Sequence, residues 1–276
     1  MSGPSIDTDA FRDFERAAHN RNAATYLDLF TVVTDRANEP LLDAAKVGPG
    51  TRLLDVAAGP GRMTQAGAAR GAMAIGIDLA PAMVALARRH YPKIEFRVAS
   101  ADALPFPNAS FDAVVCAFGL GHFPDAERVI AEFRRVLAPH GRVALSWWEG
   151  FARNRINGIF HEAIARLALS VPAVLPQGPP MDCFSDRARF AEFLNSAGFD
   201  HVEVTGVSFT RRLRDADELW QLAMGSFARA AATIGAQSQA VQRQIRAAAT
   251  QAAQQYATLG GLEIPVAFLV GAGARS

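Results

Sequence analysis

The stretch Leu53-Leu54-Asp55-Val56-Ala57-Ala58-Gly59-Pro60-Gly61-Arg62-Met63-Thr64 determines the fold that we expect for this chain. Its apolar beginning is typical of a buried strand, and its two glycines indicate a tight turn that leads into a helix. Because Gly59 and Gly61 have no Cβ, the backbone of this turn can approach a ligand closely. The stretch therefore predicts a strand, a turn and a helix that contact a nucleoside-bearing ligand.

Two further acidic residues each follow an apolar run. Asp78 lies 23 residues after Asp55, and Asp102 follows 24 residues later. Ligands of parallel sheets bind at the carboxyl ends of the strands, where a carboxylate can accept hydrogen bonds from both hydroxyls of a ribose. We therefore expect Asp78 to bind a ribose and Asp102 to accept a hydrogen bond from an adenine amino group. The alternatives are a helix N-cap for Asp78 and a solvated loop acid for Asp102.

Strands and helices alternate in the part of the chain around these acids. We expect strands at 51–57, 72–78, 94–99, 111–117 and 141–148, and helices at about 62–70, 81–90 and 125–138. This alternation is typical of an α/β fold in which helices cover both faces of a parallel sheet. The predicted core for ligand binding is therefore the segment 51–149.

The segments outside this core are expected to be mainly helical. Residues 9–46 are predicted to form an N-terminal helical lid, and the segments 150–185 and 212–258 to form helical caps over a substrate. The first cap includes a proline-rich loop at 171–180. Two closing strands are expected at 201–211 and 262–271, so that residues 1–276 form a single domain.

Composition argues against several functional classes. Half of the 276 residues are hydrophobic, and the net charge of +1 gives no basic field for nucleic acid. No apolar run approaches the roughly 20 residues that a membrane span needs, and the polar segment 1–9 does not resemble a signal peptide. The two cysteines, Cys116 and Cys183, are expected to be reduced thiols, and no common metal-ligand spacing occurs. We expect a cytoplasmic protein without a metal centre.

As an ordered set, these motifs resemble the class I S-adenosylmethionine-dependent methyltransferases, and within them the ubiquinone/menaquinone C-methyltransferase-related group. The motifs that carry the resemblance lie at 54–61, 76–78, 101–106, 110–115 and 135–142, and it extends over about residues 40–150. It implies a Rossmann-like, seven-stranded, mostly parallel sheet, S-adenosylmethionine as cofactor and a small molecule as methyl acceptor. Two positions depart from the family pattern. Ala57 replaces the first motif glycine and narrows the room for the methionine group, and His140 replaces a glycine of a turn.

The resemblance also assigns residues to the cofactor. The cofactor-binding residues that it implies are Tyr26, Asp55, Ala57, Gly59, Gly61, Asp78, Leu79, Met83, Ala101, Asp102, Ala103 and Phe118. Leu79 and Met83 would contact the adenine, and Ala103 would supply a backbone amide close to it. Phe118 would face the sulfonium, and Tyr26 would close over the cofactor.

Methyl transfer requires a base only if the acceptor must lose a proton, because the methyl group is already activated. His122 follows the fourth strand and is the candidate base, with a packing or helix-capping role as the alternative. Candidate residues of the acceptor pocket are Trp147, Phe151, Phe160, Met181, Phe184 and Met224. The alternative for each is simple packing of the cap on the core. Their apolar character favours an aromatic or lipophilic acceptor, with oxygen as the favoured methylated atom.

Other functions remain compatible with these residues. The same fold and cofactor can serve methylation of carbon or nitrogen, or a different reaction such as cyclisation. A non-catalytic binding module that needs a partner chain is a further alternative. A nicotinamide dehydrogenase is disfavoured because Thr64 occupies the third glycine position of G-x-G-x-x-G. The sequence does not determine the oligomeric state, for which a homodimer is one candidate.

Overall fold

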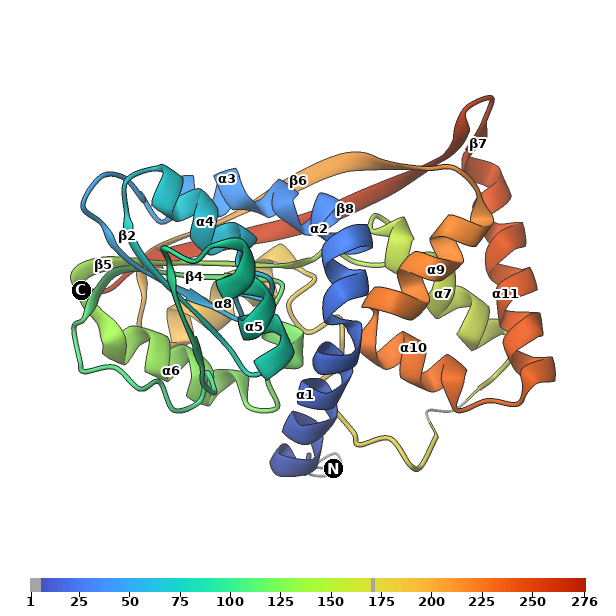
Figure 1. The fold of residues 1–276 in the computed structure, drawn as a ribbon, viewed down its shortest axis with the longest axis horizontal. Coiled ribbons are helices and arrows are strands. Elements are labelled where there is room, and N and C mark those ends of the chain that lie inside the picture. The colour runs from blue at the N-terminus through green and yellow to red at the C-terminus, as the bar shows by residue number, and fades with distance from the viewer. Residues whose placement is uncertain (1–5, 170–171) are drawn as a thin grey trace.

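A computed structural model of the chain describes residues 6–169 and 172–276, and Figure 1 shows its fold. The expected polar segment 1–9 and the expected cap 150–185, with the start of its proline-rich loop, therefore lie partly outside the described residues. Within the described part of the chain, no helix is both long and apolar enough to cross a bilayer.

One mixed sheet forms the centre of the fold. Its parallel strands are β1 (Arg52–Val56), β2 (Met73–Asp78), β3 (Glu95–Val98), β4 (Phe111–Ala117) and β5 (Leu137–Trp148). The antiparallel strands are β6 (Asp200–Leu213), β8 (Gly261–Ala274) and the two-residue β7 (Ala257–Thr258). The order β3-β2-β1-β4-β5-β8-β6, with β7 attached to β8, confirms the expected mostly parallel sheet and adds a short eighth strand. Strand order reverses between β1 and β4, which is where ligands bind in open α/β sheets.

Helices cover both faces of this sheet. In the view of Figure 1, α3 (Asn38–Ala44) and α4 (Arg62–Ala69) lie above the sheet, and α6 (Ala126–Val136) lies below it. Two further helices complete the layers: α5 (Pro81–His90) joins β2 to β3, and α8 (Arg187–Ser196) packs against β6 and β8. The side chains of Leu53, Leu54 and Val114 are fully buried between these layers. Burial of such side chains, at about 1.5–3 kcal/mol each, stabilises the layered arrangement.

A second group of helices lies beyond one end of the parallel strands, on the right of Figure 1. It consists of α7 (Arg155–Arg166), α9 (Ala216–Ser226), α10 (Ala228–Gly235) and α11 (Gln239–Ala253). Between this group and the sheet runs α1 (Thr8–Thr25), which contacts α5, α9 and α10. The chain then continues through a π-helical turn (Tyr26–Phe30), α2 (Thr31–Thr34) and a 3₁₀ turn (Asp35–Ala37) into α3. The N-terminal segment thus connects the two groups of helices.

Several element boundaries differ from the expected ones. Residues 215–258 are not continuously helical: the helices break at Phe227 and before Ser238, and residues 254–258 form a 3₁₀ turn and β7. High helix propensity runs through the whole segment, so local pattern does not reveal the break at Phe227, whose ring packs against Phe30 and Phe160. The closing strands are also longer than expected, because β6 and β8 pair with each other along almost their entire length.

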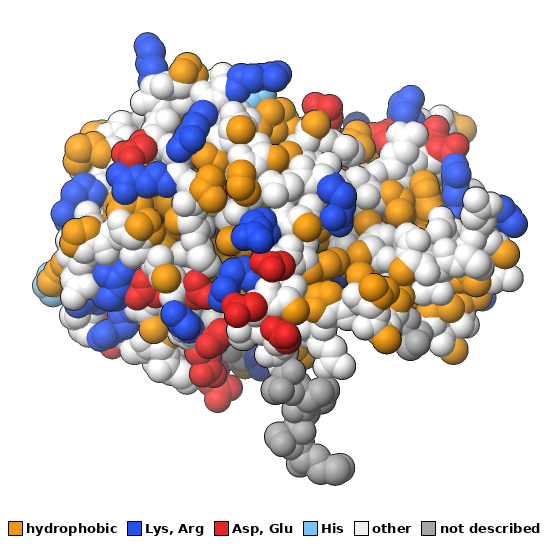
Figure 2. All heavy atoms as spheres, turned by 60° about the horizontal axis from the view of Figure 1, so that its bottom comes forward, with side chains coloured by type: hydrophobic (Ala, Val, Ile, Leu, Met, Phe, Trp, Pro, Cys, Tyr) orange, Lys and Arg blue, Asp and Glu red, His pale blue; other side chains and the backbone are white. Residues whose placement is uncertain are grey.

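Charged side chains of both signs are mixed on the face of the molecule shown in Figure 2. Acidic side chains gather near the lower centre of this face. Two acids of α1, Asp9 and Asp13, form ion pairs with Arg12 and Arg16 one turn further along the helix. Exposed pairs of this kind contribute little to stability, typically under about 1 kcal/mol.

Candidate active site

A cavity of about 480 Å³ lies at the carboxyl ends of β1, β2 and β4. Its wall on the sheet side includes Ala57, Gly59, Asp78 and Phe118, and its opposite wall includes residues of α1, α7 and α10. Cavities of this size are typical of small-molecule and cofactor sites. The cavity therefore lies where the strand order predicts a ligand, and the helical segments enclose it.

The two glycines of the turn after β1 are required for different reasons. Gly59 has a φ of +53°, and a Cβ built on it meets no other atom within 4 Å, so its backbone faces open space at the cavity. Gly61 has a φ of +86°, and a Cβ there would lie 2.7 Å from the ring of Phe96. Gly59 thus leaves room for a ligand, whereas Gly61 allows α4 to start against Phe96 and does not line the cavity.

Asp78 connects the ends of two strands. One carboxylate oxygen accepts a hydrogen bond from the Gly59 amide and the other from the Ala80 amide, both at 2.8 Å. Burial raises the pKa of Asp78 above its ordinary value, although both amides favour the ionised form. The carboxylate therefore holds the glycine turn against β2 and at the same time lines the cavity.

Asp55 lies beneath the turn rather than in the main cavity. Its side chain is buried and accepts a hydrogen bond of 2.6 Å from the hydroxyl of Thr64, while its Oδ1 has no partner among the described residues. Burial raises the pKa of Asp55 to about 7. Asp55 thus contacts the first turn of α4, and the structure does not bring it to the wall that contains Asp78.

Asp55→Asn is expected to make the free energy of unfolding less dependent on pH. Because the pKa of Asp55 is about 7 in the folded chain and 3.8 ordinarily, the folded state binds the proton more tightly. This contribution to stability is fully present below about pH 4 and is lost as the pH rises to about 7. Asparagine cannot ionise and still offers Thr64 an oxygen. Urea unfolding should show the variant gaining on the order of 2–3 kcal/mol relative to wild type between about pH 5 and pH 8. A difference that does not change with pH would contradict this explanation.

Residues of the third strand end are placed in two ways. Asp102 and Ala101 line the cavity, and the carboxylate of Asp102 accepts a hydrogen bond of 2.6 Å from Arg12 of α1. Ala103 does not line the cavity, and its amide donates to the carbonyl of Ser100 in a turn. The ion pair between Asp102 and Arg12 fastens α1 over this edge of the sheet.

Two residues with left-handed backbone conformations mark the same edge. Ala57 after β1 has a φ of 58°, and Phe118 after β4 has a φ of 57°. Such conformations cost a residue with a Cβ roughly 1–2 kcal/mol and cluster at functional sites. The ring of Phe118 stacks on Trp148 with a centroid distance of 4.0 Å, which fixes it in the wall of the cavity. Ala57 thus occupies a conformation that a glycine would adopt without strain.

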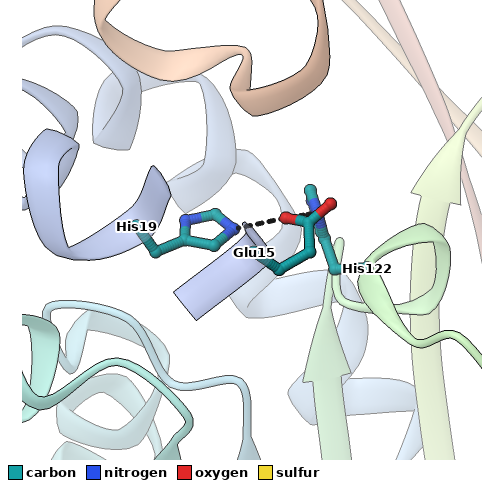
Figure 3. A group of neighbouring side chains, drawn as sticks. All are labelled: Glu15, His19 and His122. Carbon is teal, nitrogen blue, oxygen red and sulfur yellow. Dashed lines mark hydrogen bonds and ion pairs between the residues drawn. The ribbon is translucent and has the colours of Figure 1, made fainter. Parts of the chain in front are cut away.

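The cavity wall also contains a buried carboxylate with two histidines. Figure 3 shows these side chains, which are Glu15, His19 and His122. Oε2 of Glu15 accepts a hydrogen bond of 2.9 Å from Nδ1 of His122 and lies 3.4 Å from Nε2 of His19. Glu15 and His19 are one turn apart on α1, and His122 ends the 3₁₀ turn Leu120–His122 after β4. The sequence prediction included only His122. The available signal was Glu15 on the face of α1 that also carries the buried Phe11 and Ala18.

The charges in this cluster stabilise one another. Burial alone would raise the pKa of Glu15, but the two histidines outweigh it and hold that pKa below its usual range. Burial alone would lower the pKa of His19, but Glu15 and Asp78 raise it above its ordinary value. Burial lowers the pKa of Arg229, whose Nε lies 3.7 Å from Oε1 of Glu15. Arg229 also donates hydrogen bonds to the carbonyls of Pro179 and Gly121, which fixes α10 above the cluster.

The expected acceptor residues divide into two groups. Phe151 and Met181 line the cavity, whereas Trp147, Phe160, Phe184 and Met224 do not. Trp147 is fully buried and donates from its indole nitrogen to the carbonyl of Met181, and Phe184 packs against two phenylalanines of α8. Aromatic residues of the cavity wall that were not among these six include Phe30, Phe123, Trp148 and Phe227, together with His161, which stacks on Phe151. Apolar character alone does not separate residues that line a cavity from those that pack beneath it.

Residues 54–145 match the family described as "Methyltransferase domain". The chain is 36% identical to the demethylmenaquinone methyltransferase of Renibacterium salmoninarum over 177 residues, which are 61% of this chain and 75% of that protein. It is 34% identical to the ubiquinone biosynthesis O-methyltransferase of Xanthomonas axonopodis pv. citri over 173 residues, or 60% and 70% of the two chains. The YcgJ protein of Bacillus subtilis has a similar fold, with a TM-score of 0.55 at 17% identity, over 88% of this chain and 99% of that one.

These similarities define a methyltransferase. The chain belongs to the class I S-adenosylmethionine-dependent methyltransferases, and it is an enzyme that methylates a small molecule. S-adenosylmethionine is its cofactor, which supplies a methyl group bonded to a positively charged sulfur. The cavity fits this group, because it combines the open space above Gly59 with the buried carboxylate of Asp78 and an apolar remainder.

Proposed function

We propose that this enzyme transfers the methyl group to an oxygen of a small aromatic or lipophilic acceptor. One observation carries the proposal: a single cavity contains both the Gly59–Asp78 edge and the ring of His122. The acidic edge suits a nucleoside, and the histidine suits a hydroxyl that must lose its proton. Both groups of residues therefore face one reaction space.

In this proposal the strand ends hold the cofactor. Asp78 accepts hydrogen bonds from the ribose hydroxyls, and Leu79 and Met83 contact the adenine. Asp102 accepts a hydrogen bond from the adenine amino group, and Ala101 lies beside the adenine. Tyr26 and Phe118 enclose the sulfur end, near Ala57. The support for this arrangement is that all of these residues line the cavity. Asp55, Gly61 and Ala103 act indirectly, since they shape the two turns on which the cavity residues lie.

The acceptor occupies the apolar side of the cavity, toward the helices. Its walls include Phe30, Trp148, Phe151 and Phe227, and these rings favour a planar apolar molecule. Residues 9–46 act as the lid and residues 150–185 and 212–258 as the caps, so that the reacting groups are shielded from water. A cytoplasmic, single-domain enzyme remains the prediction of the sequence.

The chain's residues orient the reactants and move one proton. His122 accepts the proton of the acceptor hydroxyl, while the aromatic walls hold its oxygen in line with the methyl carbon. Methylation of carbon is the second candidate, because the sequence resembles the menaquinone C-methyltransferase-related group and is 36% identical to a demethylmenaquinone methyltransferase.

The test is an assay with a radiolabelled methyl donor and a panel of phenols, catechols and reduced quinones. We expect label in an ether product, identified by mass spectrometry and NMR, with phenolic acceptors. Label on a ring carbon would replace the proposed O-methylation by the second candidate. No transfer to any acceptor of the panel would contradict the proposed substrate class.

A further inference from the structure

Glu15 is a buried carboxylate whose closest polar neighbours are two histidine rings. Only 1% of the residue is exposed, and its Oε1 has no hydrogen-bond partner among the described residues. Its Oε2 lies between the two imidazole rings, as Figure 3 shows. A carboxylate at such a depth is costly unless charged partners compensate it. An apolar side chain at this position would be enough to pack α1, so the buried carboxylate calls for a further explanation.

The hydrogen bond between Glu15 and His122 determines that one particular nitrogen of the histidine ring carries a hydrogen. An ionised carboxylate can only accept, so Nδ1 of His122 must carry the hydrogen of this 2.9 Å bond. Nε2 of the neutral ring is then the acceptor nitrogen. The side chain of His122 is 28% exposed whereas that of Glu15 is 2% exposed, and the ring belongs to the cavity wall.

His122 is not the only basic side chain close to the Glu15 carboxylate. His19 on α1 and Arg229 on α10 lie close to the same carboxylate, so its negative charge is shared among three partners. The charge of Asp78, at the end of β2, also raises the pKa of His19, and Arg12 forms an ion pair with Asp102.

We propose that Glu15 and His19 are positioning residues which hold His122 protonated at Nδ1, so that Nε2 takes the proton of a weakly acidic hydroxyl. The inference rests on the proposed function and narrows its substrate class to phenols and similar hydroxyls that are not ionised in solution. The acceptor's O–H bond breaks and an N–H bond forms at Nε2. An O–CH₃ bond forms as the carbon–sulfur bond breaks, and the electron pair of that bond goes to sulfur. Glu15 then stabilises the imidazolium until the proton passes to water.

Glu15, His19 and His122 could also bind a metal ion, and the test must separate this use from the positioning of a base. Their ligand atoms lie within 4.8 Å of one another, as in a site for a divalent cation. Arg229, 3.7 Å from Oε1 of Glu15, disfavours a second cation there. Chelators should have no effect if Glu15 positions His122 as the base, and Nδ1 of His122 then carries a hydrogen. A metal site would respond to chelators, and a ring nitrogen that binds the metal carries no hydrogen.

The principal variant is Glu15→Gln, which keeps the size of the side chain and removes its charge. Turnover with weakly acidic phenols should fall at least roughly 10-fold, toward the 10²–10⁴-fold that general base catalysis contributes. The loss should shrink along a series of substituted phenols as their hydroxyls become more acidic, because an ionised acceptor needs no base. Glu162→Gln is the matched control, since it removes a carboxylate of α7 that pairs with Arg155 outside the cavity wall. Calorimetry with S-adenosylhomocysteine should give wild-type affinity for both variants.

An equal fractional loss of turnover for every phenol, or no loss, would overturn the proposal that Glu15 positions His122 as the base. Activity that chelators abolish and Zn²⁺ or Mn²⁺ restores would assign the cluster to a metal instead. If Glu15→Gln does not fold, Glu15→Asp keeps the charge, retracts the carboxylate, and should give a smaller loss with the same trend. Nitrogen-15 NMR of the imidazole rings provides a readout that does not depend on turnover. In the wild type we expect His122 to carry its hydrogen at Nδ1 and not at Nε2. The tautomer can therefore be refuted even if no acceptor is methylated, and a wild type inactive with all phenols would refute the proposed function alone.

Discussion

Asp78→Ala is expected to weaken the binding of S-adenosylhomocysteine by about 1.5–3 kcal/mol, or roughly 10–150-fold in Kd. The reason is the loss of charge-assisted hydrogen bonds between the carboxylate and the ribose hydroxyls. Isothermal titration calorimetry measures the affinity, and circular dichroism verifies that the variant is folded. Asp112→Ala is the matched control, because Asp112 pairs with Arg52 at the amino end of β4 and does not line the cavity.

Asp78 also stabilises the turn at Gly59, and the experiment must separate this contribution from its contact with the ribose. The carboxylate also accepts hydrogen bonds from the amides of Gly59 and Ala80, so the variant loosens the glycine turn as well. A double-mutant cycle with methylthioadenosine and its 2′,3′-dideoxy analogue isolates the ribose contact. Removal of the hydroxyls should weaken binding to the wild type and have little effect on binding to the variant. An unchanged Kd in Asp78→Ala would refute the ribose assignment.

His122→Ala is expected to lower turnover roughly 10²-fold or more, while the affinity for S-adenosylhomocysteine stays close to that of the wild type. The variant removes Nε2, the group that we propose accepts the hydroxyl proton. Steady-state kinetics with a phenolic acceptor measures the effect, and added imidazole should restore part of the turnover. His90→Ala, at the exposed end of α5, serves as the matched histidine control. Near-normal turnover in His122→Ala would leave this residue a structural role only.

The sequence predicted the sheet, and the edge at which the cavity lies, because both depend on local patterns. The run before Asp55, the turn at Gly59 and the acid at Asp78 follow one another within a short stretch, and parallel strands bring their ends together. The long pairing of β6 with β8 was underestimated, because it depends on contacts between distant parts of the chain. Local pattern also did not distinguish Gly59, which faces the cavity, from Gly61, which packs against Phe96.

The acceptor side was less predictable for a physical reason. Aromatic residues that line the cavity, such as Phe30 and Trp148, have the same apolar character as Trp147 and Phe160, which are buried in the core. Glu15 was missed because its place in the cavity wall depends on how α1 docks over the sheet, and a helix docked differently would leave it exposed. Only its position among buried apolar residues of α1 hinted that it is more than a surface acid.

The most direct test of the central claim is a crystal structure of the enzyme with S-adenosylhomocysteine and a phenol. We predict that the adenosine lies at the ends of β1, β2 and β3, with its ribose on Asp78 and its sulfur directed toward the phenol beside His122. S-adenosylhomocysteine bound at another surface, with this cavity left to water or filled by the enzyme's own side chains, would contradict the claim.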